Sequence, residues 1–317
     1  MTVLDEHPVD PVEEEFLAII DAGERAEPTD PLLPGYRRHL VRQICQHAHG
    51  EVVGMQPEAN WLTRAPTLRR KAVLLAKIQD EAGHGLYLYS VAEALGAVRE
   101  EFLAELRDGR QKYSSIVNYP TLNWADVMTE GWLVDGVVLA MQVPLQRCSY
   151  GPYARAMVRI CKEESFHQRQ GFQGMLEMAR GTEEQRRMAQ DALDRFWYPV
   201  LTVPGPPDSD SPHLGNATRW GIKSVTNDDV RQRFVDSVVP QAEFLGLRVP
   251  DDDLRWNAER GHYDFTRPDW AEWQRVVAGH GPCNRSRLDT IVQAHEDGAW
   301  VREAALAHAA KRREAAA

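Results

Sequence analysis

The sequence predicts an all-α protein, in which a bundle of four long helices is followed by a helical C-terminal extension. Apolar residues recur at intervals of three and four along four long segments, which is the periodicity of helices with one buried face. Alternating valine and isoleucine runs and hairpin turns are missing, so the sequence does not support a sheet. With 43% hydrophobic and 26% charged residues among 317, the composition is that of a globular protein with a substantial core.

The chain is expected to have three parts. Residues 1–33 carry acidic residues and prolines without periodicity, and we expect them to form a poorly ordered leader. Residues 34–200 hold the bundle. Its four long helices, and a shorter one that Thr182 would cap, are expected at residues 36–55, 67–95, 124–147, 153–180 and 182–198.

The third part, residues 201–317, is expected to pack on the bundle or on a partner. It starts with a loop rich in proline, glycine and serine at residues 204–216. An irregular aromatic stretch at residues 253–265 follows its first helix. The helices of this extension are expected at residues 228–245, 269–278 and 285–313.

The charge and the cysteines exclude several classes of protein. A net charge of -10 does not suit nonspecific binding of nucleic acid, because phosphate contacts need a basic surface. No run of about 18 apolar residues occurs, and the acidic N-terminus is unlike a secretory signal, so we expect a cytoplasmic protein that does not enter a membrane. Four scattered cysteines without a Cys-x-x-Cys pair argue against a zinc knot, an iron–sulfur cluster or a disulfide framework.

One stretch departs from the acidic average. Between Arg37 and Lys77, eight basic residues stand against two acidic ones, which gives a local charge of +6. A phosphorylated small molecule or an acidic partner would suit this patch, and a solvated face is an equal alternative.

Glu-x-x-His pairs are the first candidates for chemistry, because this spacing brings a carboxylate and an imidazole to one helix face. The chain has three, at Glu81, Glu164 and Glu259, whereas 25 glutamates and 11 histidines predict about one by chance. Glu81 and Glu164 lie on apolar stripes, where an ionised carboxylate costs several kcal/mol unless it is paired or bound to a metal. Glu259 lies in a polar stretch with glycine, and we assign it to chance.

Two further acids complete the pattern. Asp135 interrupts the apolar segment WLVDGVVLAM, and Glu51 lies in line with the apolar face of the first long helix. The acid precedes its Glu-x-x-His pair by 30 residues in one half and by 29 in the other. Four carboxylates with two imidazoles suit iron or manganese better than zinc or copper. The predicted ligands of a dimetal centre, which are also the candidate catalytic residues, are Glu51, Glu81, His84, Asp135, Glu164 and His167.

Other interpretations of these residues stay open. A single buried acid is also explained by a salt bridge, and Lys77, four residues before Glu81, is a possible partner. Glycines 83, 85, 131, 136 and 171 near the predicted ligands either free volume for substrate and O2 or allow close helix packing.

The six residues and their surroundings make the chain similar to one family, the catalytic A subunits of the phenylacetyl-CoA epoxidases, which are bacterial multicomponent ring-1,2-epoxidases. The resemblance runs almost from end to end. It is carried by segments such as RQICQHAHGEVVGMQPEANWLTRAPTLRRKA, AKIQDEAGHGLYLYS, KYSSIVNYPTLNWAD, GWLVDG and SYGPYARAMVRICKEESFHQRQGF.

The resemblance implies a ferritin-like bundle with two non-haem iron ions at the six residues. It implies that the aromatic ring of phenylacetyl-CoA receives one oxygen atom of O2 to give the 1,2-epoxide, in aerobic phenylacetate catabolism. It also implies partners: a similar but catalytically silent C subunit, a small B subunit, and a reductase that passes electrons from NADPH through flavin and iron–sulfur groups. The residues agree on one point, because the chain has neither a Gly-x-Gly-x-x-Gly fingerprint nor a cysteine cluster of its own.

Substrate contacts carried over from the resemblance are residues whose cations and hydroxyl groups suit the phosphates of coenzyme A. They are Arg42, Gln46, Lys112, Tyr113, Ser114, Ser115 and Lys223.

Three other functions compete with ring epoxidation. The first is a di-iron hydroxylase of another acyl-CoA or aromatic compound. The second is a ferritin-like iron store, for which far more than two iron ions per chain would be expected. The third is a metal-free structural subunit, which the six predicted ligands argue against.

Overall fold

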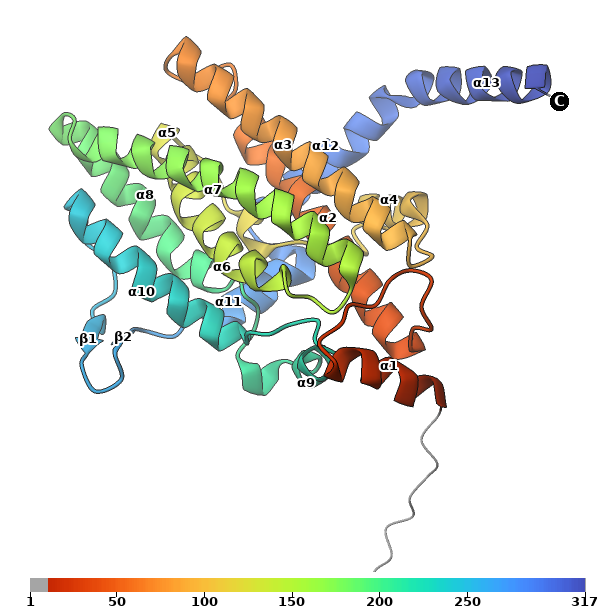
Figure 1. Ribbon diagram of the computed structural model, residues 1–317. Helices are drawn as coiled ribbons and strands as arrows, with labels where there is room; N and C mark the ends of the chain where they lie inside the picture. The colour runs from red at the N-terminus through yellow and green to blue at the C-terminus, as the bar shows by residue number, and fades with distance from the viewer. Residues whose placement is uncertain (1–10, 317) are drawn as a thin grey trace, which may run out of the picture.

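The computed structural model describes residues 11–316, and it confirms the expected all-α, ferritin-like bundle (Figure 1). The two long helices of the first half pack closely on each other, and the third long segment runs beside the fourth. These bundle elements are α2 (Pro34–Ala59), α3 (Leu68–Glu93), α5 (Trp124–Thr129), the π-helical turn η2 (Glu130–Val134), α6 (Asp135–Leu145) and α7 (Gly151–Ala179).

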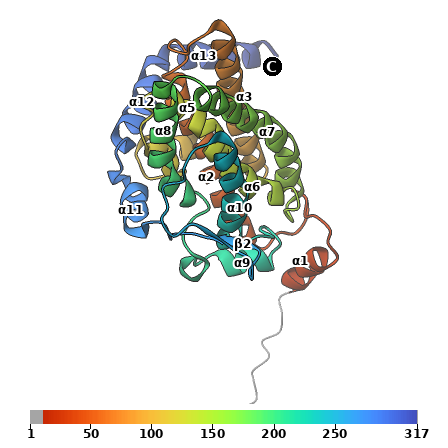
Figure 2. The ribbon, with the colours of Figure 1, turned by 90° about the vertical axis from the view of Figure 1, so that its left-hand side faces the viewer.

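Shorter elements surround the bundle. Along the chain, α1 (Pro11–Asp21) precedes the bundle, and α4 (Arg99–Arg107) and η1 (Ser115–Asn118) lie between α3 and α5. After α7 come α8 (Glu183–Leu201), η3 (Asp208–Asp210), α9 (Leu214–Arg219), α10 (Asn227–Leu245), β1 (Arg255–Asn257), β2 (His262–Asp264), α11 (Trp270–Arg275), η4 (Val276–His280), α12 (Asn284–Asp297) and α13 (Ala299–Ala316). The view turned by 90° places α1 and α11 on opposite sides of the bundle (Figure 2).

The structure explains several helix ends by capping. The hydroxyl of Thr182 accepts a hydrogen bond from the Gln185 amide, and the Gln185 side chain accepts one from Thr182, so the predicted start of α8 is confirmed. Thr67 caps α3 in a similar way, through the Arg70 amide. At the end of α10, Gly246 adopts a left-handed conformation that residues with a side chain rarely adopt.

The expected leader differs from the structure over residues 11–33. Here α1 packs on the bundle through Phe16, which is fully buried with its ring 4.6 Å from that of Tyr36. Beyond α1, the Ala26 amide donates to the Ser149 carbonyl at 2.7 Å. α1 has only eleven residues, and its apolar positions follow one another in the run FLAII without a clear helical periodicity, which is why the sequence pattern missed it. Residues 1–10 of the leader lie outside the described part of the chain.

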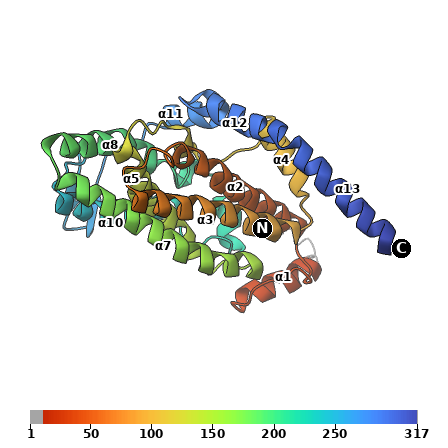
Figure 3. The same cartoon turned by 90° about the horizontal axis from the view of Figure 1, so that it is seen from above.

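The C-terminal extension departs from expectation in three places. Residues 253–265 contain a small antiparallel hairpin, with Arg255 opposite Asp264, so the prediction of no sheet is wrong here. The loop predicted at 204–216 holds η3 and the first residues of α9. The single helix predicted at 285–313 breaks at Gly298 into α12 and α13, and α13 projects away from the body (Figures 1 and 3). Among the helices of residues 11–316, none combines the length and apolar character needed to cross a membrane.

The core consists of two apolar clusters stacked along the bundle axis. On α2, Ala48 belongs to one cluster and Val53 to the other. On α3, Leu74 and Leu88 are divided in the same way, as are Ile160 and Met175 on α7. On each of these three helices, the predicted metal ligands lie between the two apolar residues just named. A polar layer therefore separates two apolar cores.

Two glycines allow α7 to approach η2 at backbone distance. A Cβ atom on Gly131 would lie 3.0 Å from the Cα of Gly171, and a Cβ on Gly171 would overlap the backbone of Gly131 and Trp132. For these two positions the structure supports close packing. At Gly83, by contrast, an added Cβ meets nothing within 4 Å among the described atoms.

We therefore expect opposite effects from the same substitution at two glycines. Gly171→Ala should lower the free energy of unfolding by about 3 kcal/mol, because backbone cannot move aside as a side chain can. Gly83→Ala should raise it by up to about 1 kcal/mol, because alanine is the better helix former and has room. Urea denaturation followed by circular dichroism measures both. Equal stability of the two variants would contradict this account of the contact.

Candidate metal centre

The structure brings all six predicted ligands together in two overlapping groups. The first contains Glu51, Glu81, His84 and Glu164, and the second contains Asp135, Glu164 and His167. Within each group, one ligand atom per residue lies within 4.8 Å of the others. All six side chains are buried. Glu164 belongs to both groups, so its carboxylate stands between two positions at which a cation could bind.

Both imidazoles turn Nδ1 toward the acids. His84 Nδ1 lies 3.2 Å from Glu164 Oε1 and 3.6 Å from Glu51 Oε2. His167 Nδ1 lies 3.5 Å from both Glu81 Oε1 and Glu164 Oε2. Within the described residues, neither buried Nδ1 atom has a hydrogen-bond partner. Two unsatisfied ring nitrogens facing four carboxylates fit a pair of iron ions well, because a metal would satisfy every one of these atoms.

The opposite ring nitrogens are held by two acids that the sequence analysis missed. His84 Nε2 donates to Glu163 Oε2 at 3.0 Å, and His167 Nε2 donates to Asp80 Oδ2 at 3.1 Å. Each of these acids directly precedes the glutamate of a Glu-x-x-His pair, but it supports the histidine of the other helix. Such a carboxylate fixes which ring nitrogen carries the proton and so leaves Nδ1 free for a metal. The doubled acids Asp80-Glu81 and Glu163-Glu164 were the available sequence signal.

The pKa values show how strongly the carboxylates and imidazoles of the cluster interact. Burial, together with the nearby carboxylates of Glu164 and Glu51, raises the pKa of Glu81 well above its usual value. Burial alone would lower the pKa of His84, but the facing carboxylates of Glu164 and Glu51 raise it to about 11. The pKa of His167 is also raised to about 11, by Glu164 and Glu81 against the effect of burial. Positive charge is therefore strongly favoured at this place.

Lys77 does not pair with Glu81, which was the alternative considered from the sequence. Its Nζ atom lies 2.6 Å from Glu58 Oε1 and 2.6 Å from Asp135 Oδ2. Burial lowers the pKa of Lys77, but these two carboxylates outweigh it and raise the pKa well above its usual value. Burial raises the pKa of Asp135 to about 7 although Lys77 opposes this shift. The salt bridge thus joins α2, α3 and α6 beside the second group of ligands.

Asp135 owes its position to the π-helical turn. The sequence predicted one continuous helix at residues 124–147, but η2 interrupts it from Glu130 to Val134. A π turn holds one extra residue and is frequent at functional sites. Asp135 is the first residue after this turn and points into the polar layer.

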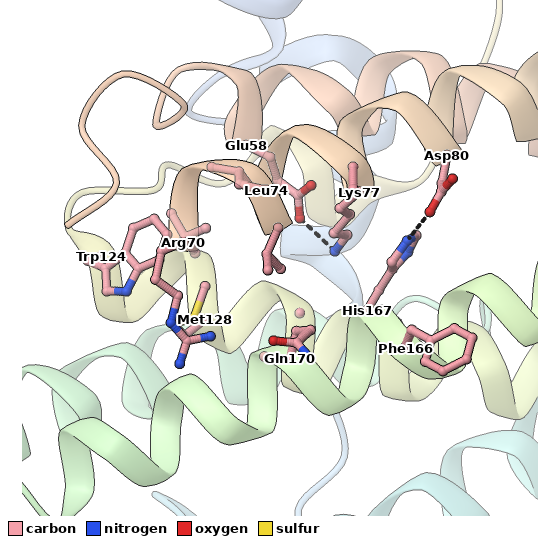
Figure 4. A pocket seen from close by; sticks show the side chains of 15 residues that line it. Glu58, Arg70, Leu74, Lys77, Asp80, Trp124, Met128, Phe166, His167 and Gln170 are labelled. Atoms are coloured by element: carbon pink, nitrogen blue, oxygen red, sulfur yellow. Dashed lines mark hydrogen bonds and ion pairs between the residues drawn. The ribbon is translucent and has the colours of Figure 1, made fainter. Parts of the chain in front are cut away.

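A cavity of about 180 Å³ lies beside the centre, between α3, α5 and α7 (Figure 4). Lys77, Asp80 and His167 line its inner part, and apolar side chains that include Leu74 and Met128 line much of the rest. The Gly131–Gly171 contact forms part of its wall. The sequence analysis did not predict this cavity, because no single helix contains it.

The residues expected to contact coenzyme A lie in two places. Arg42 is exposed on α2, and its guanidinium lies 2.8 Å from His213 Nε2 and 3.3 Å from His39 Nδ1. Lys223 donates to Asn227 Oδ1 at 3.2 Å, and burial lowers its pKa.

Four of the other expected contacts, residues 112–115, lie at the start of η1 or just before it. Ser115 is buried, with its hydroxyl 3.2 Å from that of Thr202, while Tyr113 donates to Asn118 Oδ1. The buried hydroxyl of Ser114 has no partner within the described residues. Lys112 is exposed, and so is Gln46, which lies on α2 one turn after Arg42. The seven residues are thus not gathered into one cluster, and their role stays a prediction.

The two supporting acids should matter for metal affinity. Asp80→Asn and Glu163→Gln keep side-chain size but remove the charge that orients His167 and His84. We expect each to weaken iron binding about 10- to 100-fold, the usual range for such partners. Competition with a chelator of known affinity measures the change. Glu177→Gln, on the exposed side of α7, is the matched control, and an unchanged affinity in both test variants would refute the orienting role.

Comparisons with known proteins agree with this site. The family model described as "Phenylacetic acid catabolic protein" matches residues 9–300. A relative from Escherichia coli (strain K12), the A subunit of 1,2-phenylacetyl-CoA epoxidase, is 59% identical over 299 residues. This alignment covers 94% of the chain and 97% of the relative. The chain therefore belongs to the phenylacetic acid catabolic protein family.

Proposed function

We propose that this chain is the catalytic subunit of a multicomponent di-iron monooxygenase that converts the aromatic ring of phenylacetyl-CoA into the 1,2-epoxide, in phenylacetate catabolism. One observation carries the proposal. A buried cluster of four carboxylates and two imidazoles, with Glu164 common to both groups, occurs in a chain that is 59% identical to the A subunit of such an epoxidase.

The residues of the cluster would hold two iron ions, which supply the activation of O2 and the transfer of one oxygen atom to the ring. Glu51, Glu81, His84 and Glu164 would hold one ion, and Asp135, Glu164 and His167 the other, with each imidazole binding through Nδ1. Asp80 and Glu163 hold the imidazoles in position. The two apolar clusters on either side exclude water, which strengthens every electrostatic interaction between them.

The electrons for the reaction would come from a separate reductase that is fed by NADPH. The four cysteines are scattered and lack the Cys-x-x-Cys spacing typical of an iron–sulfur cluster, which supports a separate source of electrons. The relative is itself named as one component of an enzyme, which supports a complex with further components. For this chain we propose the reductase, a B subunit, which is small, and a C subunit as partners.

Coenzyme A would bind with its phosphates near Arg42 and Lys223. Arg42 contacts only imidazole nitrogens and Lys223 only a neutral amide oxygen among the hydrogen bonds of the described residues, so both can accept an anion. Asn227, which accepts from Lys223, donates in turn to the Pro206 carbonyl, and the hydroxyl of Ser115 in η1 lies 3.2 Å from that of Thr202.

The proposed reaction is tested with the reconstituted complex. The iron-loaded chain, its companion subunits, NADPH, O2 and phenylacetyl-CoA are incubated together, and mass spectrometry follows the thioester. We expect one added oxygen atom per product molecule and about two iron ions per chain. A complex that holds iron but leaves phenylacetyl-CoA unchanged, or that oxygenates another acyl-CoA in its place, would contradict the proposed substrate.

Substrate affinity should depend on Arg42. Arg42→Gln is expected to raise the KM for phenylacetyl-CoA at least about tenfold, because a hydrogen bond to a charged group is worth about 1.5–3 kcal/mol. The iron content and kcat should change little, since the side chain lies on the surface. Arg186→Gln, at an exposed position of α8, is the control. Equal KM values for the two variants would remove Arg42 from the substrate site.

A further inference from the structure

The outer face of α3 carries a long stripe of exposed residues without charge. Between Ala72 and Ser90, the exposed residues of α3 are Ala72, Leu75, Ala76, Gln79, Leu86 and Ser90. Asp80, a partly exposed charged side chain beside them, is paired with His167. Leu75 and Leu86 are 52% and 56% exposed, and Leu68, one turn before the stripe, is 83% exposed. A solvated helix face normally carries charged residues, so this stripe is unusual for a surface that stays in water.

The spacing along the stripe is that of a helix–helix contact. Leu68, Ala72, Leu75, Gln79, Ala82 and Leu86 follow one another at intervals of four, three, four, three and four residues. This is the heptad pattern by which one helix packs against another. From Leu68 to Ser90 the face is about 33 Å long, enough for several turns of a second helix. No described element of this chain covers it.

The neighbouring helix adds positive charge to the same face. In Figure 3, α3 and α7 run side by side, and they are in contact. Between Arg155 and Arg169, the exposed residues of α7 include four basic side chains and no acidic one. They are Arg155, Arg159, Lys162 and Arg169. Lys162 and Arg169 have no ion-pair partner among the described residues, in a chain whose net charge is -10.

We propose that the α3 stripe and the basic edge of α7 form the docking surface for an acidic helical partner, another component of the complex. The heptad spacing specifies a helix as the occupant, and the flanking lysine and arginine side chains specify acidic residues on it. A second copy of this chain fits less well, because a two-fold contact would bring Lys162 and Arg169 of both copies to one interface. The inference rests on the proposed function only in treating the chain as one component of a complex.

This surface lies on the same helices as the metal centre and borders the cavity beside it. The same two helices carry both Glu-x-x-His pairs, and Ala76 and Phe166 are exposed residues that also line the cavity beside His167. A partner seated here would therefore cover the outer end of that cavity.

The test measures binding without substrate or turnover. A failure to form epoxide would therefore contradict the proposed function but would not affect the binding result. The purified chain is titrated with each companion subunit of its complex, expressed separately, by isothermal titration calorimetry. The test variant is Leu75→Glu/Leu86→Glu, and Leu75→Ala/Leu86→Ala is a milder version. Leu306→Glu is the matched control, because Leu306 is another exposed leucine and lies on the projecting helix α13.

We expect the glutamate variant to bind one companion at least about 30-fold more weakly, with unchanged circular dichroism, melting temperature and iron content. Lys162→Glu/Arg169→Glu should also weaken binding and reduce its dependence on salt. In the unmodified complex, hydrogen exchange at residues 72–90 should slow. Binding lost through Leu306→Glu but kept in the α3 variants would overturn the proposal. So would a dimer of the chain alone that Leu75→Glu/Leu86→Glu dissociates, or the absence of binding to every companion.

Discussion

Replacing Glu164 by alanine is expected to abolish metal binding, from about two iron ions per chain to well below one. Glu164 belongs to both groups of ligands, and its two oxygens face the two imidazoles separately. Loss of this carboxylate therefore removes a ligand from both metal positions at once. It also leaves His84 and His167 without the acid that contributes most to their raised pKa values. Elemental analysis after anaerobic loading with ferrous iron gives the iron content directly.

The matched control for this variant is Glu177→Ala, on the same helix but on its exposed side. It should keep the full iron content and the same helical signal. A Glu164→Ala protein that keeps two iron ions would refute the shared role of this carboxylate. Loss of iron in Glu177→Ala as well would instead indicate that α7 tolerates no change.

Replacing Lys77 by methionine is expected to lower the free energy of unfolding of the metal-free chain by about 3–5 kcal/mol. Removing one partner of a buried salt bridge has this cost, because the remaining charge is left in the core without compensation. Here two buried carboxylates, Glu58 and Asp135, lose their only cation within 4 Å among the described residues. Methionine fills a similar volume, so the change isolates the charge.

A double variant separates charge from packing. In Lys77→Met/Glu58→Gln, one of the stranded carboxylates is neutral, and part of the lost stability should return. Glu58→Gln alone completes the cycle, which gives the coupling energy between the two side chains. Urea denaturation of the four proteins is the measurement. Additive effects would show that Lys77 and Glu58 do not stabilise each other.

The sequence was sufficient to locate the six predicted ligands because side chains recur on the same face of a helix every three or four residues. An acid or imidazole placed among apolar residues at intervals of three and four must face the core, and this needs no knowledge of the other helices. Asp80 and Glu163 escaped the same reasoning because they lie on the edge of the buried face. Their role became visible only when α3 and α7 were placed together, since each acid serves the opposite helix.

Contacts between distant parts of the chain were not predictable in the same way. Lys77 and Asp135 are 58 residues apart, whereas the sequence suggested only the partner one turn away. The packing of α1 depends on the Tyr36 ring, and the close approach at Gly131 and Gly171 depends on the crossing of two helices. The sequence left two explanations for these glycines, and tertiary structure decided between them.

The π-helical turn before Asp135 sets the direction of the aspartate by its width. Each residue of an α-helix turns the chain by about 100°, and the wide turn accommodates one extra residue without that rotation. If the five residues from Glu130 to Val134 formed a regular α-helix instead, the remainder of α6 would rotate by that angle. Asp135 would then leave the polar layer although no residue of the cluster had been changed. A substitution that closes this turn would therefore disable the site as completely as a substitution of the aspartate itself.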